Sequence, residues 1–430
     1  MAEELCCTKK VSYIWKLQFD HRGVQTDTLF IFNMNESWVL SHQMKLTAMF
    51  FTSIFLAVAS ADILQNPDFE LPPSNWKENP TSPLFPLDAN STIPGWTFEG
   101  AVEYATVGED ISLPRKGHAI LLGQDGKINQ TFTAKGDTVQ FLMTFTLAIV
   151  GQNCNSNASL VVSAPDSSAQ FSFSGKYGKK LWEVYCHQIG SWGDGDSINL
   201  VLQSQAIDAD TNSTCWPVVD NLLLSTIGTL NQDKVNLLPN GGFEFGPSFL
   251  EFTNDGVLLD SEPSLIESAL QQWTVMGTVK YIDSNGYFVP EGKSAVELVS
   301  GVSAGVQTAK ELSKESSYDL EFMLGDANDS CTGDFTVGVL AGSTVQNFTI
   351  QSDGTGSAKK FSLAFKASEP SPTIISFQSY TTKQREDGVF CGPVIDAVIL
   401  HSSRGHISRL NGASLIALLF IALLKMRELQ

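Results

Sequence analysis

Apolar and polar residues alternate in short stretches along most of the chain, as in "AQFSFSG" (Ala169–Gly175) and "SINLVLQS" (Ser197–Ser204). β-Branched and aromatic residues are common in these stretches, and Gly, Asn, Asp and Ser separate them. Long amphipathic helical patterns are scarce. Because the antiparallel strands of a sandwich show this alternation and spacing, we predict an all-β chain.

Two motifs occur twice. The opening motif "NPDFE" (Asn66–Glu70) returns 174 residues later as "NGGFE" (Asn240–Glu244). The closing motif "CWPVVD" (Cys215–Asp220) returns 176 residues later as "CGPVID" (Cys391–Asp396). Other matches keep nearly the same offset, so we interpret the chain as a tandem duplication. The predicted copies span residues 62–228 and 236–401.

The length of one copy, about 160 residues, suits a jelly roll. In such a fold the first and last strands often lie close together. The opening and closing motifs would then mark the two ends of each sandwich, brought side by side. We therefore predict two tandem jelly-roll β-sandwiches.

The cysteines agree with the duplication. Cys154 and Cys331 occupy equivalent positions, as do Cys215 and Cys391. A secreted chain should pair its cysteines, so we predict the disulfides Cys154–Cys215 and Cys331–Cys391. Cys186 has no counterpart in the second copy and is predicted to be a reduced, buried thiol. A zinc site is a poor alternative, because the sequence has no C-x-x-C and no nearby His pair.

Residues 44–61 have the features of a secretory signal peptide: Lys45, an apolar run, and small residues at Ala59 and Ala61. Because such a signal belongs at the N-terminus, we interpret residues 1–43 as a mispredicted extension. The mature chain is then expected to begin at Asp62. A transmembrane anchor is the weaker alternative, since the apolar run is short for a bilayer.

The C-terminal segment, residues 402–430, combines small residues, a polar spacer and the apolar tail "GASLIALLFIALL" (Gly412–Leu424). The tail is too short for a standard spanning helix. This order of features predicts a GPI-anchor signal and hence membrane attachment. The alternative is an amphiphilic appendage.

The net charge is −19, which argues against nucleic acid as a partner because nucleic-acid binding needs a basic surface. Six N-x-S/T sequons in the predicted mature region favour secretion as a glycoprotein. They are Asn90, Asn129, Asn157, Asn212, Asn328 and Asn347.

No catalytic motif stands out. The sequence has no H-E-x-x-H and no P-loop, and no His recurs between the copies. A glycosidase needs only two carboxylates brought together, and 46 Asp and Glu residues leave that alternative open. We expect a non-catalytic protein with no catalytic residues.

Four carboxylates recur at the predicted sandwich ends, Glu70 with Asp220 and Glu244 with Asp396. If the end strands pair, each Glu meets its Asp. Two carboxylates and backbone carbonyls suit Ca²⁺, so we predict one structural calcium per sandwich and no other cofactor. The alternative is that these side chains cap turns or pair with Lys or Arg.

Aromatic side chains are the candidates for glycan binding, because sugar rings stack on flat apolar faces. Trp96 and Trp273 recur, which favours a place in the core. Trp76, Trp182 and Trp192 belong to the first copy alone. We therefore expect these three to be exposed and to bind ligand.

The stretch "LLPNGGFEFGP" (Leu237–Pro247), a downstream Trp, "CGPVID", the twofold repeat, the signal segment and the apolar tail together resemble the plant cell-wall family called domain of unknown function 642. The resemblance implies two galactose-binding-like jelly rolls in the apoplast. It also implies association with wall polysaccharide, cellulose or pectin-related, and modulation of pectin methylesterases. No catalytic residues are implied. The "NGGFE" opening also resembles those of bacterial carbohydrate-binding modules, where the matching Glu and Asp hold calcium.

The first copy departs from this family at its closing motif, where Trp216 stands in place of the usual Gly. If that Gly needs a positive φ, Trp is costly there. We therefore predict a secreted, non-catalytic wall protein that binds polysaccharide or modulates a wall enzyme. The alternative is a secreted glycan-active enzyme with a carboxylate pair in a β-sandwich groove.

Overall fold

The computed structural model describes most of the two predicted copies and two short stretches before them. The described residues are 11–17, 28–34, 63–77, 82–108, 111–113, 115, 117–136, 139–150, 158–177, 181–205, 215–227, 236–251, 253–261, 268–367 and 372–403. The signal segment and the apolar tail lie outside them. In the described part of the chain, no helix is long and apolar enough to cross a membrane.

Residues 1–61 form one compact unit and residues 62–430 form another. In the first unit, β1 (Val11–Leu17) pairs with β2 (Thr28–Met34) in antiparallel register, with Val11 opposite Met34.

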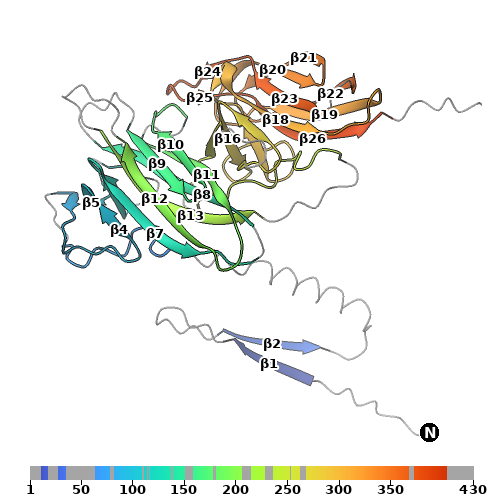
Figure 1. Cartoon of the computed structure of the whole chain (residues 1–430). Helices are drawn as coiled ribbons and strands as arrows, with labels where there is room; N and C mark the ends of the chain where they lie inside the picture. The colour runs from blue at the N-terminus through green and yellow to red at the C-terminus, as the bar shows by residue number, and fades with distance from the viewer. Residues whose placement is uncertain are drawn as a thin grey trace, which may run out of the picture. The chain divides into compact units, whose positions relative to one another are not determined.

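The first copy consists of two sheets (Figure 1). One sheet has the strand order β3 (Leu84–Pro86), β5 (Val102–Thr106), β6 (His118–Leu122), β13 (Trp216–Ile227), β8 (Val139–Val150) and β11 (Trp182–Trp192). The other has the order β4 (Thr97–Glu99), β7 (Lys127–Thr133), β12 (Ser197–Gln205), β9 (Ser159–Ala164) and β10 (Ser167–Ser172). Apolar residues from both sheets form one core.

The second copy repeats this topology strand for strand. Its first sheet has the order β14 (Val257–Asp260), β16 (Thr278–Asp283), β17 (Ser294–Glu297), β26 (Val394–Ser402), β19 (Ser317–Gly325) and β22 (Ala358–Lys366). Its second sheet has the order β15 (Thr274–Met276), β18 (Gly305–Lys310), β23 (Thr373–Ser379), β20 (Thr332–Ala341) and β21 (Thr344–Asp353). A 3₁₀ turn η1 (Gly301–Ser303) and the strand pair β24 (Lys383–Gln384) and β25 (Phe390–Cys391) complete it. The predicted pair of jelly rolls is confirmed.

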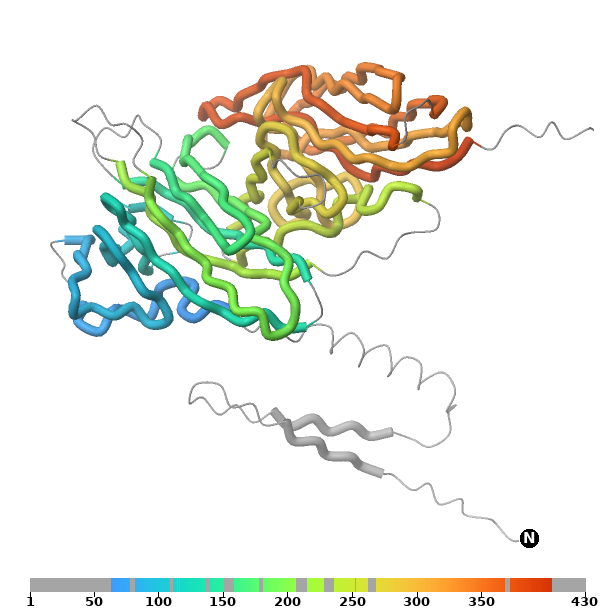
Figure 2. Tube along the Cα trace, in the orientation of Figure 1, coloured from blue at the N-terminus to red at the C-terminus, as the bar shows by residue number. Residues whose placement is uncertain are grey.

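The two copies share a sheet. The edge strand β11 pairs in parallel with the edge strand β14 at Tyr185 and Leu258, which joins the two six-stranded sheets into one sheet of twelve. Val184 and Cys186 of β11 pack into the core cluster of the second copy. The trace in Figure 2 runs from blue to green through the first copy and from yellow to red through the second.

Burial follows the alternation seen in the sequence. Along β12 the side chains of Ile198, Leu200 and Leu202 are buried, whereas Ser197 and Asn199 are exposed. Since every second side chain of a strand faces the same side, this strand covers the core with one face only.

The cysteines largely follow the predicted pattern. Cys331 and Cys391 form a disulfide with Cα atoms 6.0 Å apart. Cys215 is also disulfide-bonded, and its predicted partner Cys154 lies outside the described residues. Cys186 is buried and keeps its thiol.

Candidate functional site

The opening and closing motifs meet in both copies. In the first copy the Leu222 backbone N–H donates to the Pro67 carbonyl oxygen at 2.9 Å. In the second the Val398 N–H donates to the Gly241 carbonyl oxygen at 2.8 Å. The recurring motifs therefore lie side by side in each copy, as the jelly-roll interpretation predicted.

The opening motif forms a tight turn held by its Asn. Asn66 and Phe69 have φ of 49° and 51°, and Asn240 and Phe243 have φ of 51° and 52°. A positive φ is rare for Phe, so the surroundings must hold it. The Asn66 side-chain amide makes two hydrogen bonds to Leu71. Its oxygen accepts the Leu71 backbone N–H at 2.9 Å, and its nitrogen donates to the Leu71 carbonyl oxygen at 3.0 Å.

Two buried aromatic side chains fix this turn. The Trp96 indole N–H donates to the Asn66 carbonyl at 3.2 Å, and the Tyr104 hydroxyl donates to the Phe69 carbonyl at 2.8 Å. Trp273 and Tyr281 make the same bonds in the second copy, at 3.1 and 2.8 Å. The core position predicted for both Trp residues is confirmed. The Tyr pair was missed, although it recurs at the same offset.

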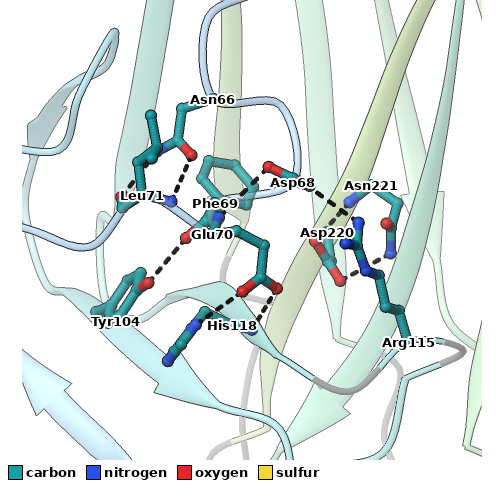
Figure 3. Close-up of polar contacts among 10 residues, drawn as sticks. All are labelled: Asn66, Asp68, Phe69, Glu70, Leu71, Tyr104, Arg115, His118, Asp220 and Asn221. Atoms are coloured by element: carbon teal, nitrogen blue, oxygen red, sulfur yellow. Dashed lines mark hydrogen bonds and ion pairs between the residues drawn. The ribbon is translucent and has the colours of Figure 1, made fainter. Parts of the chain in front are cut away.

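Figure 3 shows that the Glu70 carboxylate turns toward His118. One oxygen accepts the His118 backbone N–H at 2.9 Å, and the other lies 3.1 Å from the ring Nδ1. The carboxylate fills the space over Gly117, where an added Cβ would lie 1.8 Å from Oε1. Glu244 lies over Gly292 in the same way, with a corresponding distance of 1.9 Å.

The closing-motif carboxylates are buried and hold backbone turns. Asp220 accepts the backbone N–H of Asn221 at 2.6 Å and its side-chain amide at 2.7 Å. Asp396 accepts the N–H of Glu291 at 2.8 Å and that of Ala397 at 2.6 Å. Burial raises the pKa of Asp220 well above its usual value and that of Asp396 to about 7, and the nearby acidic side chains add to both shifts.

The hydrogen bonds that these carboxylates accept bear directly on the predicted calcium sites. Ca²⁺ takes six to eight oxygen ligands. Glu70, Asp220, Glu244 and Asp396 instead accept N–H groups. Within the described residues, no group of three or more His, Cys, Asp or Glu could hold a metal ion. The contacts as placed agree with turn capping, the alternative, and calcium binding by these carboxylates stays a prediction.

One cluster belongs to the first copy alone. Arg115 and Asp68 form an ion pair at 3.2 Å. The His118 ring stacks on Tyr104 with centroids 4.9 Å apart, and Trp76 meets His118 edge-on at 5.1 Å. Trp76 is therefore half-buried against these rings.

Trp192 is a core residue, so its predicted exposure is wrong. Only 8% of its surface is exposed, and its ring packs on Phe132 and Phe141. It ends β11, and its side chain points to the interior, while the Gly and Asp residues that follow form the turn.

Trp182, the third candidate, lies in the wall of a cavity between the two copies. Its indole N–H donates to Asp255 Oδ2 of the second copy at 3.0 Å. Tyr177 of the first copy and Tyr287 of the second also line the cavity. Three aromatic side chains from both copies thus surround one space.

The charged groups of the cavity are already paired. The Lys280 Nζ lies 3.4 Å from the Glu297 Oε2, and both side chains are buried. Burial raises the pKa of Glu297 to about 7, although Lys280 opposes the shift. Arg385 pairs with Asp387 at 2.6 Å.

The two carboxylates of the cavity wall are occupied as well. Glu183 accepts the backbone N–H groups of Ser174 and Tyr177, each at 3.1 Å, and the Tyr185 hydroxyl at 2.8 Å. Asp255 accepts the Thr253 hydroxyl at 2.6 Å besides the Trp182 indole. Both carboxylates therefore hold the wall in place.

The family model described as "Protein of unknown function (DUF642)" matches residues 62–225 and 236–401. The chain belongs to the DUF642 family. One DUF642 relative, "Protein DUF642 L-GALACTONO-1,4-LACTONE-RESPONSIVE GENE 2" of Arabidopsis thaliana, is 30% identical over 83% of this chain and 98% of its own. Another, "Protein TEEBE" of the same plant, is 30% identical over 80% of this chain and 91% of its own. A solved structure of the CBM22-1–CBM22-2 tandem domain of Paenibacillus barcinonensis Xyn10C aligns with a TM-score of 0.26 at 11% identity, over 72% of this chain and 94% of its own.

Gly392 of the second closing motif lies where a side chain would clash with the backbone. The Gly392 backbone is not in the left-handed region, so this position does not require a positive φ. An added Cβ would instead lie 2.0 Å from the Leu298 carbonyl oxygen. In the first copy, Trp216 begins β13 and packs on a separate apolar cluster with Leu121 and Val218.

Proposed function

We propose that this DUF642 protein is an extracellular, non-catalytic protein of the plant cell wall that binds a wall polysaccharide in the cavity between its two copies. The supporting observation is the cavity wall, to which Tyr177 and Trp182 of the first copy and Tyr287 of the second all contribute. Ligand sites in proteins are commonly concave, lined by aromatic and apolar groups, with a few placed polar groups.

The paired charges of the cavity favour a neutral glycan. Lys280 and Arg385 already have acidic partners, so an anionic sugar would have to compete with Glu297 and Asp387. Stacking on Trp182 and the tyrosines needs no charge. Cellulose and other neutral wall polymers therefore fit better than de-esterified pectin, which a chain of charge −19 also repels.

The state of the carboxylates supports binding over hydrolysis. A glycosidase acts through two carboxyl groups that reach the sugar. Glu183 and Asp255 each accept several hydrogen bonds from the protein. Glu297 has the raised pKa of a general acid, but it is fully buried beside Lys280. A glycan-active enzyme stays the alternative proposal.

The extracellular location rests on the signal segment and the sequons. The Cys331–Cys391 disulfide also suits an oxidising compartment. Attachment through a GPI anchor belongs to the same proposal.

The acidic charge favours a second activity, modulation of a pectin methylesterase. An esterase with a basic surface would be steered onto a chain of charge −19, and salt would slow that association. Binding of a purified basic esterase should weaken as ionic strength rises from 0.05 to about 0.5 M. Absence of binding at the lowest salt would remove this activity from the proposal.

The glycan proposal is tested by incubating the purified protein with cellulose, xylan, β-galactan, methylesterified pectin and de-esterified pectin. We expect retention on at least one neutral polymer and little on de-esterified pectin in the absence of calcium. Retention on de-esterified pectin alone would contradict the proposal, and release of reducing sugar would favour the enzyme.

A further inference from the structure

One patch on the five-stranded sheet of the second copy has an unusual construction. Along β20 the side chains of Phe335, Val337 and Val339 are buried in the core, so Gly338 between them faces outward. Tyr380 lies over Gly338, since an added Cβ there would lie 2.6 Å from the tyrosine Cζ. Tyr380 is nevertheless 46% exposed. The sheet thus presents one flat aromatic ring to solvent.

The backbone holds this ring in place. The Tyr380 N–H donates to the Thr336 carbonyl oxygen at 2.8 Å, which continues the pairing of β20 with β23. Gly338 is what allows the close approach, because any side chain there would displace the ring.

A sequon lies beside the ring. Asn347 is directly opposite Gly338 in the β20–β21 register, and its side chain is exposed. Asn347, Phe348 and Thr349 form an N-x-T sequon. Opposed residues of paired strands have Cβ positions about 5 Å apart, so a group on Asn347 lies within reach of the ring over Gly338.

The equivalent positions of the first copy lack all three features. There Val161 is opposite Gln170 in the β9–β10 register, where the second copy has Gly338 opposite Asn347. Gln205, the last residue of β12, occupies the position that Tyr380 has in the second copy. The glycine, the sequon and the exposed ring are therefore all present in the second copy and all absent at the equivalent positions of the first.

We propose that Asn347 carries an N-linked glycan whose first sugar packs on the exposed face of Tyr380. In the transfer, a bond forms between Asn347 Nδ2 and C1 of the sugar. The bond from C1 to the pyrophosphate oxygen of a lipid-linked oligosaccharide donor breaks, and the amide loses one proton. The apolar face of the sugar then covers the ring, so the glycan is ordered along the sheet and shields this patch from other partners.

The inference rests on the secretion included in the proposed function, because the donor is met only in the secretory pathway. The protein should be produced in plant cells and its glycopeptides analysed by mass spectrometry. We expect Asn347 to be occupied. An Asn347 without glycan beside an occupied Asn90 overturns the inference and leaves the proposed location intact. If both are without glycan, the inference and the secretion fail together.

The packing of the sugar on the ring is tested by a thermal-melting cycle with Tyr380→Ala, Asn347→Gln and the double variant. We expect Tyr380→Ala to lower Tm by about 2–4 °C more in the glycosylated protein than in the Asn347→Gln background, as expected for a stacking contact of this kind. Tyr380→Phe keeps the ring and should keep the coupling. Asn90→Gln, which removes a sequon on an exposed turn, should show none with Tyr380→Ala. Equal effects of Tyr380→Ala in both backgrounds would overturn the packing.

Discussion

The hydroxyl of Tyr281 donates to the carbonyl oxygen of Phe243 at 2.8 Å, and Tyr104 makes the same bond to Phe69 in the first copy. In both copies the carbonyl belongs to a Phe with positive φ. The bond therefore supports a turn that would otherwise be strained, at the point where the two ends of the sandwich meet.

Tyr281→Phe should accordingly destabilise the protein. The ring stays, but the buried Phe243 carbonyl loses its donor, at a cost of about 1–2 kcal/mol in the free energy of unfolding. Denaturant unfolding of the two variants Tyr281→Phe and Tyr380→Phe provides the measurement, because Tyr380 is 46% exposed and the loss of its hydroxyl should have little effect. Equal stabilities would show that the turn does not depend on this bond.

A side chain at Gly292 should destabilise the protein. Its φ is +74°, and a Cβ would lie 1.9 Å from Glu244 Oε1, so Gly292→Ala adds to the backbone strain the displacement of this carboxylate from the Lys293 N–H. We expect a loss of about 2–3 kcal/mol in unfolding free energy.

The variant Gly388→Ala is a control that has the backbone strain of a positive φ but no contact with a neighbouring side chain. Gly388 has φ of +85° but open space around it, so only the backbone strain of about 1 kcal/mol applies. If both variants lose the same free energy of unfolding, the contact between Glu244 and Gly292 does not contribute to stability.

Stability should fall as pH rises from about 4 to 7. Burial raises the folded-state pKa of Asp396 from 3.8 to about 7, so between these values the folded state binds the proton that the unfolded state has released. The stabilising contribution is complete below about pH 4 and is lost through pH 7. The raised pKa of Glu297 and Asp220 acts in the same direction.

Asp396→Asn tests the assignment of this pH dependence, because the amide cannot titrate. Its Tm should vary less between pH 4 and 7 than that of the unchanged protein. Asp334→Asn, an exposed carboxylate on β20, is the matched control and should keep the full dependence. An identical pH profile for Asp396→Asn would contradict the assignment.

If the recurring Glu and Asp side chains only cap turns, calcium should leave the melting temperature unchanged. A metal bound only by the folded state raises Tm by mass action, but the Glu and Asp oxygens at both sandwich ends already accept N–H groups. Melting curves in chelator and in millimolar calcium are therefore expected to coincide. A rise of several degrees with calcium would restore the predicted metal sites.

The fold could be predicted from the sequence because the two copies repeat the residues that the same structural features require. Trp96 and Trp273 recur since each supports the same turn. The left-handed Phe69 could not be foreseen, because φ leaves no mark on a Phe in a single sequence.

The candidate site was harder to predict from the sequence than the fold. Trp192 was misplaced because β11 is covered on both faces, so its residues lack the alternation that separates inward from outward positions. Trp182 was found, but its partner Asp255 lies in the other copy, 73 residues away, and no local pattern connects the two.

Binding of a neutral wall polysaccharide by Trp182→Ala tests the proposed function most directly. The measurement is the dissociation constant for the polymer that the unchanged protein retains, beside the control Phe245→Ala, an exposed aromatic outside the cavity wall. Thermal melting should first confirm that both variants are folded. We expect Trp182→Ala to weaken binding at least about tenfold, or about 1.4 kcal/mol, and Phe245→Ala to leave it unchanged. Unchanged affinity in a folded Trp182→Ala protein would contradict binding in the cavity.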